Sequence, residues 1–379
     1  MSEHAFLAPS SAPLWVVCHG QPTMVAQAVS YVTGDSEASR EGTAAHWALS
    51  EVLADRTVAV GQVTPQHFVL TREMVDAAED VQRWVNELAA THGEQPYMWI
   101  EHRMPMNRIH PRNWGTADLI LYFPKANVLY VIDYKFGHGW VEVFENWQVV
   151  DYTAGALEML TLEMDVRTNN TEVVLVVIQP RSYHPDGSIR MWRTTQEGLR
   201  PYHVTLGQAA NAACEPNPKL TPGTHCRRYY CAARHACPAA QNEANHAIDL
   251  TRKAVPFNLP PEVIGIELAD LRKAIKALEA RETGLAAQAE ALMTRGDRVP
   301  GWGLERKPGN LTWTLEDAEV LAMGQVLGLN LTKPAAPVTP TQAKKLGMSD
   351  EMLTGLADRP MSAAKLVEQK DQDARRIFT

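Results

Sequence analysis

The sequence predicts an α/β protein in which helices flank a mixed β-sheet and a mostly helical module follows toward the C-terminal end. Apolar residues recur at helical spacing in residues 41–55 and 71–92. Three short apolar segments come next, 97–103, 117–123 and 128–135, and each has the length and composition of a strand. Helices followed by strands within one stretch of chain predict a sheet layered against helices.

Segments 117–123 and 128–135 are joined by the turn-like tetrapeptide Pro124-Lys125-Ala126-Asn127, which predicts a β-hairpin. Asp118 and Asp133 are equidistant from the centre of that turn, so a symmetric register places their carboxylates opposite each other, at a Cβ separation of about 5 Å. Like charges at that distance repel, and chains keep such a pair mainly where a divalent cation or a shared proton offsets the repulsion. The first hypothesis is therefore a metal site. A solvated pair on the hairpin is the alternative, which the apolar flanking residues disfavour.

Lys135 adds a cation to this pair of acids. Alternation along a strand places Lys135 on the same face as Asp133, about 6.6 Å further along. Two carboxylates and one ammonium group can hold a metal ion and steady a phosphate group.

The segments after the hairpin continue the α/β pattern. Residues 145–164 have helical spacing, residues 171–179 (TEVVLVVIQ) indicate a buried strand, and Pro185-Asp186-Gly187 marks a turn before residues 188–193. An alanine-rich helix is expected from about residue 239 to residue 254.

The proline-containing stretch 256–261 predicts a domain boundary, with one domain in residues 1–258 and a second in residues 259–379. In the second domain we expect a long amphipathic helix that reaches about residue 294, for intramolecular packing or for contact with a partner. A small hairpin is expected within residues 301–313. The apolar positions that predict the helix are Leu268, Leu271, Ile275 and Leu278.

Composition limits the functional classes. The chain has 379 residues, 45% hydrophobic content and a formal net charge of −8, so any DNA contact must come from a local basic patch or through a bound metal ion. No apolar run approaches the roughly 20 residues that span a bilayer, and the N-terminus lacks the charged and apolar regions of a signal peptide. We therefore expect no membrane association and a cytoplasmic location.

Four of the five cysteines have a spacing that suggests a metal site. Cys18 stands alone, Cys226, Cys231 and Cys237 form a C-x4-C-x5-C cluster, and Cys214 is left over. In a reducing cytosol such a cluster more often binds metal than forms disulfides, and four thiolates suit zinc or an iron-sulfur cluster equally well. Unrelated buried thiols are the alternative.

The segment around these cysteines is also basic and aromatic. Arg227, Arg228 and Arg234 alternate with Tyr229 and Tyr230. Guanidinium groups pair with phosphates and aromatic rings stack on unpaired bases, which makes DNA binding one interpretation and a solvated basic loop the other.

Together these features resemble the RecB-like branch of the PD-(D/E)XK nucleases, especially its CRISPR-associated and phage-encoded members that carry an iron-sulfur cluster. Gly115-Thr116-Ala117-Asp118 is similar to the family's G-x-x-D strand, and Asp133-Tyr134-Lys135-Phe136-Gly137 to its D-Y-K-T-G motif. Gln148 and Tyr152 match the family's Q-x3-Y helix, and His46 corresponds to its helix histidine. The cysteines resemble its one-plus-three arrangement, and the likeness covers nearly the whole chain. Two departures are Phe136 in place of threonine and C-x4-C in place of C-x2-C.

The resemblance implies a restriction-endonuclease-like fold and a metal-dependent DNA nuclease. The activity expected is that of an exonuclease acting on single strands or duplex ends in phage replication or recombination, inside the bacterial host cell. Asp118, Asp133 and His46 would hold Mg²⁺ or Mn²⁺, and imidazole favours Mn²⁺. Glu101 is a further candidate ligand, with a surface salt bridge as its alternative.

The remaining roles follow from the same comparison. Lys135 would orient or help deprotonate the attacking water and contact the scissile phosphate, while Gln148 and Tyr152 would contact or support the substrate, with ordinary helix packing as the alternative. Cys18, Cys226, Cys231 and Cys237 would bind a [4Fe-4S] cluster, with zinc as the alternative, and this cluster would tie the N-terminus to the end of the nuclease domain.

Two other functional classes remain open. One is a non-catalytic DNA-binding protein that assists recombination, and the other is a zinc-stabilised interaction protein whose C-terminal helices bind a recombination partner. Asp118, Asp133 and Lys135 form a complete set, which favours the enzyme. His46 alone carries little weight, because a single histidine on a helix is often a core or surface residue.

Overall fold

The computed structural model describes residues 5–28, 37–182, 184–251, 259–305, 312–313, 315, 317–333, 336–337, 340–345, 348–358 and 365–368. The chain divides into two compact units, Met1–Gln288 and Ala289–Thr379. The boundary expected after residue 258 adjoins residues 252–258, which lie outside the described segments.

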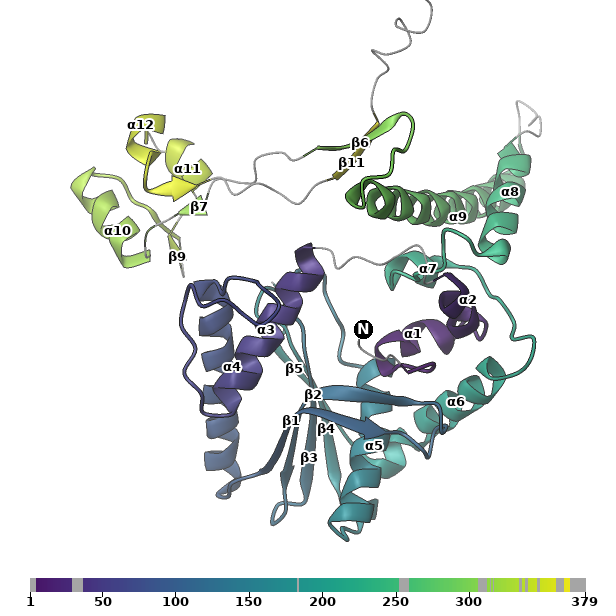
Figure 1. Ribbon diagram of the computed structural model, residues 1–379, viewed down its shortest axis with the longest axis horizontal. Helices are drawn as coiled ribbons and strands as arrows, with labels where there is room; N and C mark the ends of the chain where they lie inside the picture. Colours follow the sequence, from purple (N-terminus) through teal and green to yellow (C-terminus); the bar gives the residue numbers. More distant parts are fainter. Residues whose placement is uncertain are drawn as a thin grey trace, which may run out of the picture. The chain divides into compact units, whose positions relative to one another are not determined.

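A five-stranded mixed sheet forms the centre of the first unit (Figure 1). Its strand order is β1-β2-β3-β4-β5, and only the β3–β4 pair is parallel. The strands are β1 (Tyr97–Pro105), β2 (Trp114–Phe123), β3 (Val128–Tyr134), β4 (Glu172–Ile178) and β5 (Ile189–Thr195). The prediction of an α/β protein with a mixed sheet is confirmed.

Helices cover both faces of this sheet. The pairs α3 (Glu37–Leu53) with α4 (Arg72–His92), and α5 (Trp147–Glu163) with α6 (Gln196–Ala213), lie on opposite sides of it in Figure 1. A hydrophobic core lies on each face of the sheet, and alternate residues of β3 belong to one or the other. Leu129 and Val131 lie in the core on the α5 side, and Tyr130 lies in the core on the α4 side. Because both faces are covered, β3 and β4 are almost continuously apolar.

The helix limits have local causes. The Thr71 side chain accepts a hydrogen bond from the Met74 backbone N–H at the start of α4, and Gly93 ends that helix in a left-handed conformation with φ 66°. The Asn146 side chain accepts hydrogen bonds from Gln148 and Val149 at the start of α5. The helices predicted at 41–55, 71–92 and 145–164 are confirmed, whereas α6 was not predicted.

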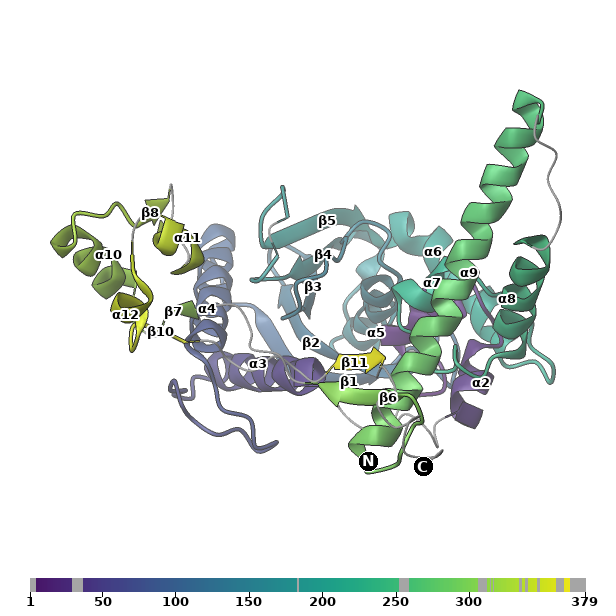
Figure 2. The ribbon, with the colours of Figure 1, turned by 90° about the horizontal axis from the view of Figure 1, so that it is seen from above.

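Shorter elements precede and follow the sheet region. At the N-terminal end are a 3-10 helix (Pro9–Ser11), α1 (Ala12–Trp15) and α2 (Gln21–Ala28), and Thr168–Asn170 forms a second 3-10 turn before β4. After α6 come α7 (Thr224–Arg228), α8 (Pro238–Thr251) and α9 (Pro261–Thr294), which Figure 2 shows from above. Helix α8 matches the alanine-rich helix that was expected, and α9 is the long amphipathic helix ending at residue 294.

The second unit combines short helices and short strand pairs around a small core that includes Val320, Leu331 and Met348. Strand β6 (Trp302–Glu305) pairs with β11 (Lys365–Glu368), β7 (Thr312–Trp313) with β10 (Ala357–Asp358), and β8 (Thr332–Lys333) with β9 (Ala336–Pro337). The helices are α10 (Asp317–Val326), α11 (Pro340–Lys345) and α12 (Asp350–Leu353). Strands β6 and β7 thus differ from the hairpin expected within 301–313, because both pair with segments far along the chain. None of the helices in the described part of the chain has the length and low charge needed to cross a membrane.

The centre of the sheet should dominate the stability of the first unit. Leu175 on β4 is fully buried in the core on the α5 side, so Leu175→Ala should lower the free energy of unfolding by about 2–5 kcal/mol. Leu162→Ala, near the end of α5, is the matched control because Leu162 is 72% exposed and should change stability little. Urea denaturation of both variants measures the difference, and equal midpoints would contradict this account of the core.

Candidate functional site

Three acidic residues lie level with one another on three adjacent strands. The β2–β3 register runs from Phe123 opposite Val128 to Leu119 opposite Ile132, which is the symmetric register predicted from the turn. One further step brings Asp118 level with Asp133. On the other side of β2, Ile100 pairs with Leu119 and His102 with Ala117, so Glu101 is level with Asp118.

His46 reaches these acids from helix α3. Its Nδ1 atom is 3.2 Å from Asp118 Oδ1 and 3.5 Å from Glu101 Oε1. One ligand atom from each of these three residues lies within 4.8 Å of the others, a spacing at which they could share a metal ion. The ring also contacts Tyr134 edge to face, with centroids 5.4 Å apart.

The backbone at Glu101 adopts an unusual conformation. Its φ angle is +45°, in the left-handed region that non-glycine residues seldom occupy. Pairing between β1 and β2 continues in the same register on both sides of Glu101, so the deviation is confined to this residue. Such local strain is typical of positions where a side chain must be directed into a site.

Asp133 is held by Lys135 and by helix α5. Asp133 Oδ1 is 3.0 Å from Lys135 Nζ and accepts a hydrogen bond of 2.8 Å from Gln148 Nε2. Lys135 Nζ also donates to Gln148 Oε1 at 3.2 Å, which closes a three-membered network. The cap at Asn146 fixes where α5 begins and therefore where Gln148 stands.

One oxygen of this network has no hydrogen-bond partner. Asp133 Oδ2 is buried, and no donor reaches it among the described residues. The neighbouring Asp118 Oδ2, in contrast, accepts a 2.6 Å hydrogen bond from the Tyr134 backbone N–H. A buried carboxylate oxygen without a donor is costly, and a cation shared with Asp118 would compensate it.

The site is buried at one end and open at the other. The Asp133 side chain is 1% exposed, whereas the Glu101 side chain is 41% exposed. A ligand can therefore reach the acids from the Glu101 side while Asp133 remains shielded from water.

The charges of the site set the pKa values of its members. Burial opposes the charge on His46, but the Asp118 carboxylate outweighs it and raises the pKa of His46 to about 10. Burial raises the pKa of Asp118, yet His46 and Lys135 bring it below its usual value. For Asp133, burial prevails and the pKa is raised.

The pKa values of Lys135 and Tyr152 are also shifted by burial and by neighbouring charges. Burial works against the ammonium of Lys135, but Asp133 and Asp118 keep its pKa above the usual value. Burial, together with the charges of Asp118 and Asp133, raises the pKa of Tyr152 on α5. The influence of both acids on Tyr152 places this residue beside the network as well.

Two side chains that the sequence analysis missed stabilise the surroundings. Gln179 Nε2 donates hydrogen bonds of 2.7 Å to the backbone oxygens of Gly137 and Gly139, which fixes the segment after Lys135. Arg181 stacks on the ring of Phe136 at 4.0 Å and pairs with acids of α3 and α4. The signal for Gln179 was its position, because it is a polar residue directly after a continuous apolar strand.

The four cysteines predicted to act together lie close to one another. Burial raises the pKa values of Cys18 and Cys226, and the proximity of Cys237 adds to both shifts. Burial and these neighbouring thiols raise the pKa of Cys231 to about 12. Cys214 lies apart from them, within 3.8 Å of an Arg112 nitrogen.

The N-terminal segment reaches this cluster through a close backbone approach. The Thr221 N–H donates to Cys18 Sγ at 3.3 Å, and the Gly20 N–H to the Lys219 oxygen at 2.9 Å. A Cβ atom on Gly20 would be 2.5 Å from the end of the Leu220 side chain and 3.0 Å from the Pro218 oxygen, so glycine allows this close approach without moving either group.

A turn accommodates the two residues by which the C-x4-C spacing of Cys226 and Cys231 exceeds C-x2-C. The Cys231 N–H donates to the Cys226 oxygen at 2.9 Å, which closes the loop between the two thiols. Tyr229 and Tyr230 lie in this loop and are exposed, and Tyr230 has a φ angle of +51°. The two additional residues therefore project outward.

The arginines predicted to bind DNA have several intramolecular contacts. Arg227 forms an ion pair with Glu279 of α9, Arg234 donates to the Cys231 and Thr283 backbone oxygens, and Arg228 lies over the Tyr229 ring. These contacts connect the cysteine loop to α9.

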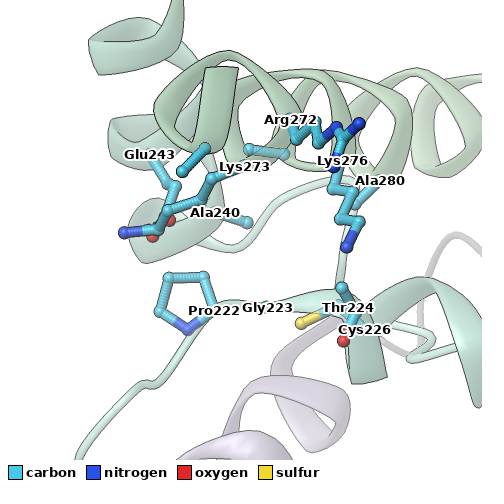
Figure 3. A pocket seen from close by; sticks show the side chains of 12 residues that line it. Pro222, Gly223, Thr224, Cys226, Ala240, Glu243, Arg272, Lys273, Lys276 and Ala280 are labelled. Atoms are coloured by element: carbon cyan, nitrogen blue, oxygen red, sulfur yellow. Dashed lines mark ion pairs between the residues drawn. The ribbon is translucent and has the colours of Figure 1, made fainter. Parts of the chain in front are cut away.

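A cavity of about 420 Å³ adjoins this loop, between α7, α8 and α9 (Figure 3). Cys226 lies at its base, and the Lys276 side chain extends from α9 toward Thr224. Lys273 pairs with Glu243 across the cavity at 3.4 Å.

Fold and site define an α/β protein with a candidate metal centre on its central hairpin and a separate cluster of four cysteines. The family model described as "Protein of unknown function (DUF2800)" matches residues 4–374, and the chain belongs to this family.

A second buried acid lies on helix α5, next to Tyr152. Asp151 is fully buried, and Asn113 Nδ2 donates hydrogen bonds of 2.8 and 3.0 Å to its two oxygens. Burial raises the pKa of Asp151 to about 8, although the hydrogen bond from Asn113 opposes the shift.

The raised pKa of Asp151 predicts a specific pH dependence of stability. Between the ordinary pKa of about 3.9 and the folded value of about 8, the folded protein keeps a proton that the unfolded chain has released. The free energy of unfolding should therefore fall as pH rises from about 4 to about 8. Asp151→Asn should reduce this fall, which urea denaturation at a series of pH values measures.

The control for this experiment is Asp80→Asn, which removes an exposed acid from α4 and should follow the wild type. An Asp151→Asn variant whose stability varies with pH as steeply as that of the wild type would contradict the assignment.

Proposed function

We propose that this protein is a divalent-metal-dependent deoxyribonuclease of the RecB-like PD-(D/E)XK type. The observation that carries the proposal is the convergence of Asp118, Asp133 and Lys135 with His46 and Gln148, which come from four different elements of the fold. The sequence motifs that resemble the nuclease family are thus spatial neighbours as well as neighbours in order.

The donor set fits a hard divalent cation. His46, Glu101 and Asp118 bring one imidazole nitrogen and two carboxylate oxygens within 4.8 Å of one another, and the neighbouring Asp133 adds a buried Oδ2 that has no donor among the described residues. Carboxylates suit Mg²⁺ and Mn²⁺, and the imidazole shifts the preference toward Mn²⁺. When bound, such a cation supplies a water of lowered pKa and offsets negative charge on the phosphate.

Residues of the chain would position the phosphate and the attacking water. Lys135 is anchored by Asp133 and Gln148, so its ammonium has a fixed position beside the acids from which it can contact the scissile phosphate and orient the attacking water. The Gln148 side chain forms hydrogen bonds with both Asp133 and Lys135 and so fixes their relative positions. Tyr152 lies next to this network and supports it from α5.

Exposed aromatic side chains favour a substrate with unpaired bases. Trp140 and Phe144 follow Lys135 closely in the chain and are 59% and 60% exposed. Trp140 is braced edge to face by His184, and Phe144 by Trp192. Rings held in place at the surface can stack on bases, which fits single strands or frayed duplex ends in replication or recombination.

The four cysteines fit a cationic metal group that ties the chain together. Cys18 comes from the N-terminal segment and Cys226, Cys231 and Cys237 from the segment around α7. Burial raises the pKa values of Cys18, Cys226 and Cys231, so a bound cation would be needed to hold these three as thiolates at neutral pH. We assign a [4Fe-4S] cluster to this site, with zinc as the alternative, and a structural role.

Loss of activity in variants of the first site tests the enzyme proposal. Asp133→Asn removes a ligand and Lys135→Met removes the ammonium, so each should lower metal-dependent cleavage of labelled DNA about a hundredfold or more. The assay compares single-stranded and duplex substrates with Mg²⁺ and with Mn²⁺. Circular dichroism confirms that the variants are folded.

Asp80→Asn is the matched control, because it removes an exposed acid of α4 that belongs to none of the motifs. DNA cleavage by Asp133→Asn at the wild-type rate would overturn the assignment. Metal-independent DNA binding without cleavage by the wild type would favour the non-catalytic recombination-accessory function.

Removal of one cluster cysteine should destabilise the fold, whereas removal of the fifth cysteine should not. We expect Cys226→Ala to lose bound metal and to unfold at a lower temperature, because the N-terminal segment is no longer tied to the α7 loop. Cys214→Ala is the control. Metal analysis and an absorption band near roughly 400 nm distinguish iron-sulfur from zinc. Equal metal content in Cys226→Ala and wild type would contradict the cluster.

A further inference from the structure

Helix α9 carries a heptad repeat of apolar residues. Ile264, Leu268, Leu271, Ile275 and Leu278 are spaced by four, three, four and three residues, which is the d-a-d-a-d pattern of a coiled coil. We call these five residues the α9 seam. The next core position is Glu282, which interrupts the apolar series before Leu285.

Four of the five residues of the α9 seam face solvent, and the fifth, Leu278, is half-buried. Ile264, Leu268, Leu271 and Ile275 are between 39% and 53% exposed. Large apolar side chains aligned on one face of a helix are seldom left uncovered, whereas single exposed apolar residues are common.

The opposite face of α9 explains why the seam is left open. Ala280 is buried, and a Cβ atom on Gly284 would lie 2.9 Å from the backbone of His235. Small residues thus bring this face against the cysteine loop, and Lys273 and Lys276 line the cavity on the same side (Figure 3). Arg272, between this face and the seam, also lines the cavity. In a helix of 3.6 residues per turn, the α9 seam then points away from the rest of the first unit.

The charges beside the α9 seam suit a second copy of the same helix. Glu267 is at a g position and Arg272 at the following e position. In a parallel two-stranded coiled coil, residue g of one helix faces residue e of the next heptad in its partner, so Glu267 and Arg272 attract each other twice across a symmetric pair. The other e and g positions between residues 264 and 279 are glycine, alanine and Glu279, so no like charges face each other.

We propose that two copies of this protein associate through a parallel coiled coil of their α9 seams. Each of the five seam residues packs against its equivalent in the partner, and the two Glu267–Arg272 pairs flank them. Five core layers make a short coiled coil, so the dimer is in exchange with monomer rather than permanent. The acids of the β2–β3 hairpin have no part in this contact.

The oligomeric state of the full-length protein tests the proposal. Sedimentation equilibrium over a wide range of concentrations should show a reversible monomer–dimer equilibrium for the wild type. Leu268→Asp and Ile275→Asp place a charge in the core of the seam and should each raise the dimer dissociation constant about tenfold or more. Both residues are exposed in the monomer, so the variants should fold, which circular dichroism and the metal content confirm.

Ile266→Asp is the matched control. Ile266 is 63% exposed, more than the seam residues, but it lies off the seam, so this variant should dimerise like the wild type. A wild type that is monomeric at every concentration overturns the proposal, as does equal weakening by Ile266→Asp and Leu268→Asp, which would indicate unspecific apolar association.

Charge reversal tests the parallel arrangement. Glu267→Arg and Arg272→Glu should each weaken the dimer, because like charges then face each other, and the double variant should restore it. Failure of the double variant to restore dimerisation would overturn the parallel pairing. DNA cleavage in the same samples is a separate readout, so the outcome for α9 does not depend on the nuclease assignment.

Discussion

The register of the β2–β3 hairpin is the constraint on which the candidate site depends. A symmetric turn at residues 124–127 leaves Asp118 level with Asp133, and a shift of one residue would move one of them to the other face of the sheet. The register is secured by apolar residues that are buried on both faces, so burial of the core also fixes the distance between the two acids. Stability and site geometry therefore have the same origin.

Side chains from both helical layers complete this arrangement. His46 from α3 balances Asp118, and Gln148 from α5 joins Asp133 to Lys135. Each acid thus has a positively charged neighbour, which reduces the cost of two carboxylates in a largely buried position. The cysteine cluster is a second point of attachment, where an N-terminal segment meets a late part of the chain.

Features encoded locally could be predicted from the sequence, and features that depend on distant segments could not. The hairpin followed from one turn and two apolar runs, and the α3, α4 and α5 helices from their periodicity. Helix α6 was missed because Gly198 and Pro201 lie within it and weaken a helical pattern. The pairing of β6 with β11 joins residues about sixty positions apart, for which the sequence carries no local signal. Motif spacing predicted which residues gather at the hairpin. It did not predict that Asp133 Oδ2 lacks a hydrogen-bond donor among the described residues, or that the backbone of Glu101 is left-handed.

The left-handed backbone of Glu101 has a consequence for how this protein tolerates change. A residue with a Cβ atom pays about 1 kcal/mol or more to occupy that region, and glycine does not. Replacement by glycine would relieve the torsional strain while removing a carboxylate from the candidate metal site. Selection for thermal stability alone would thus tend to replace Glu101, whereas selection for the proposed metal-dependent activity would retain it.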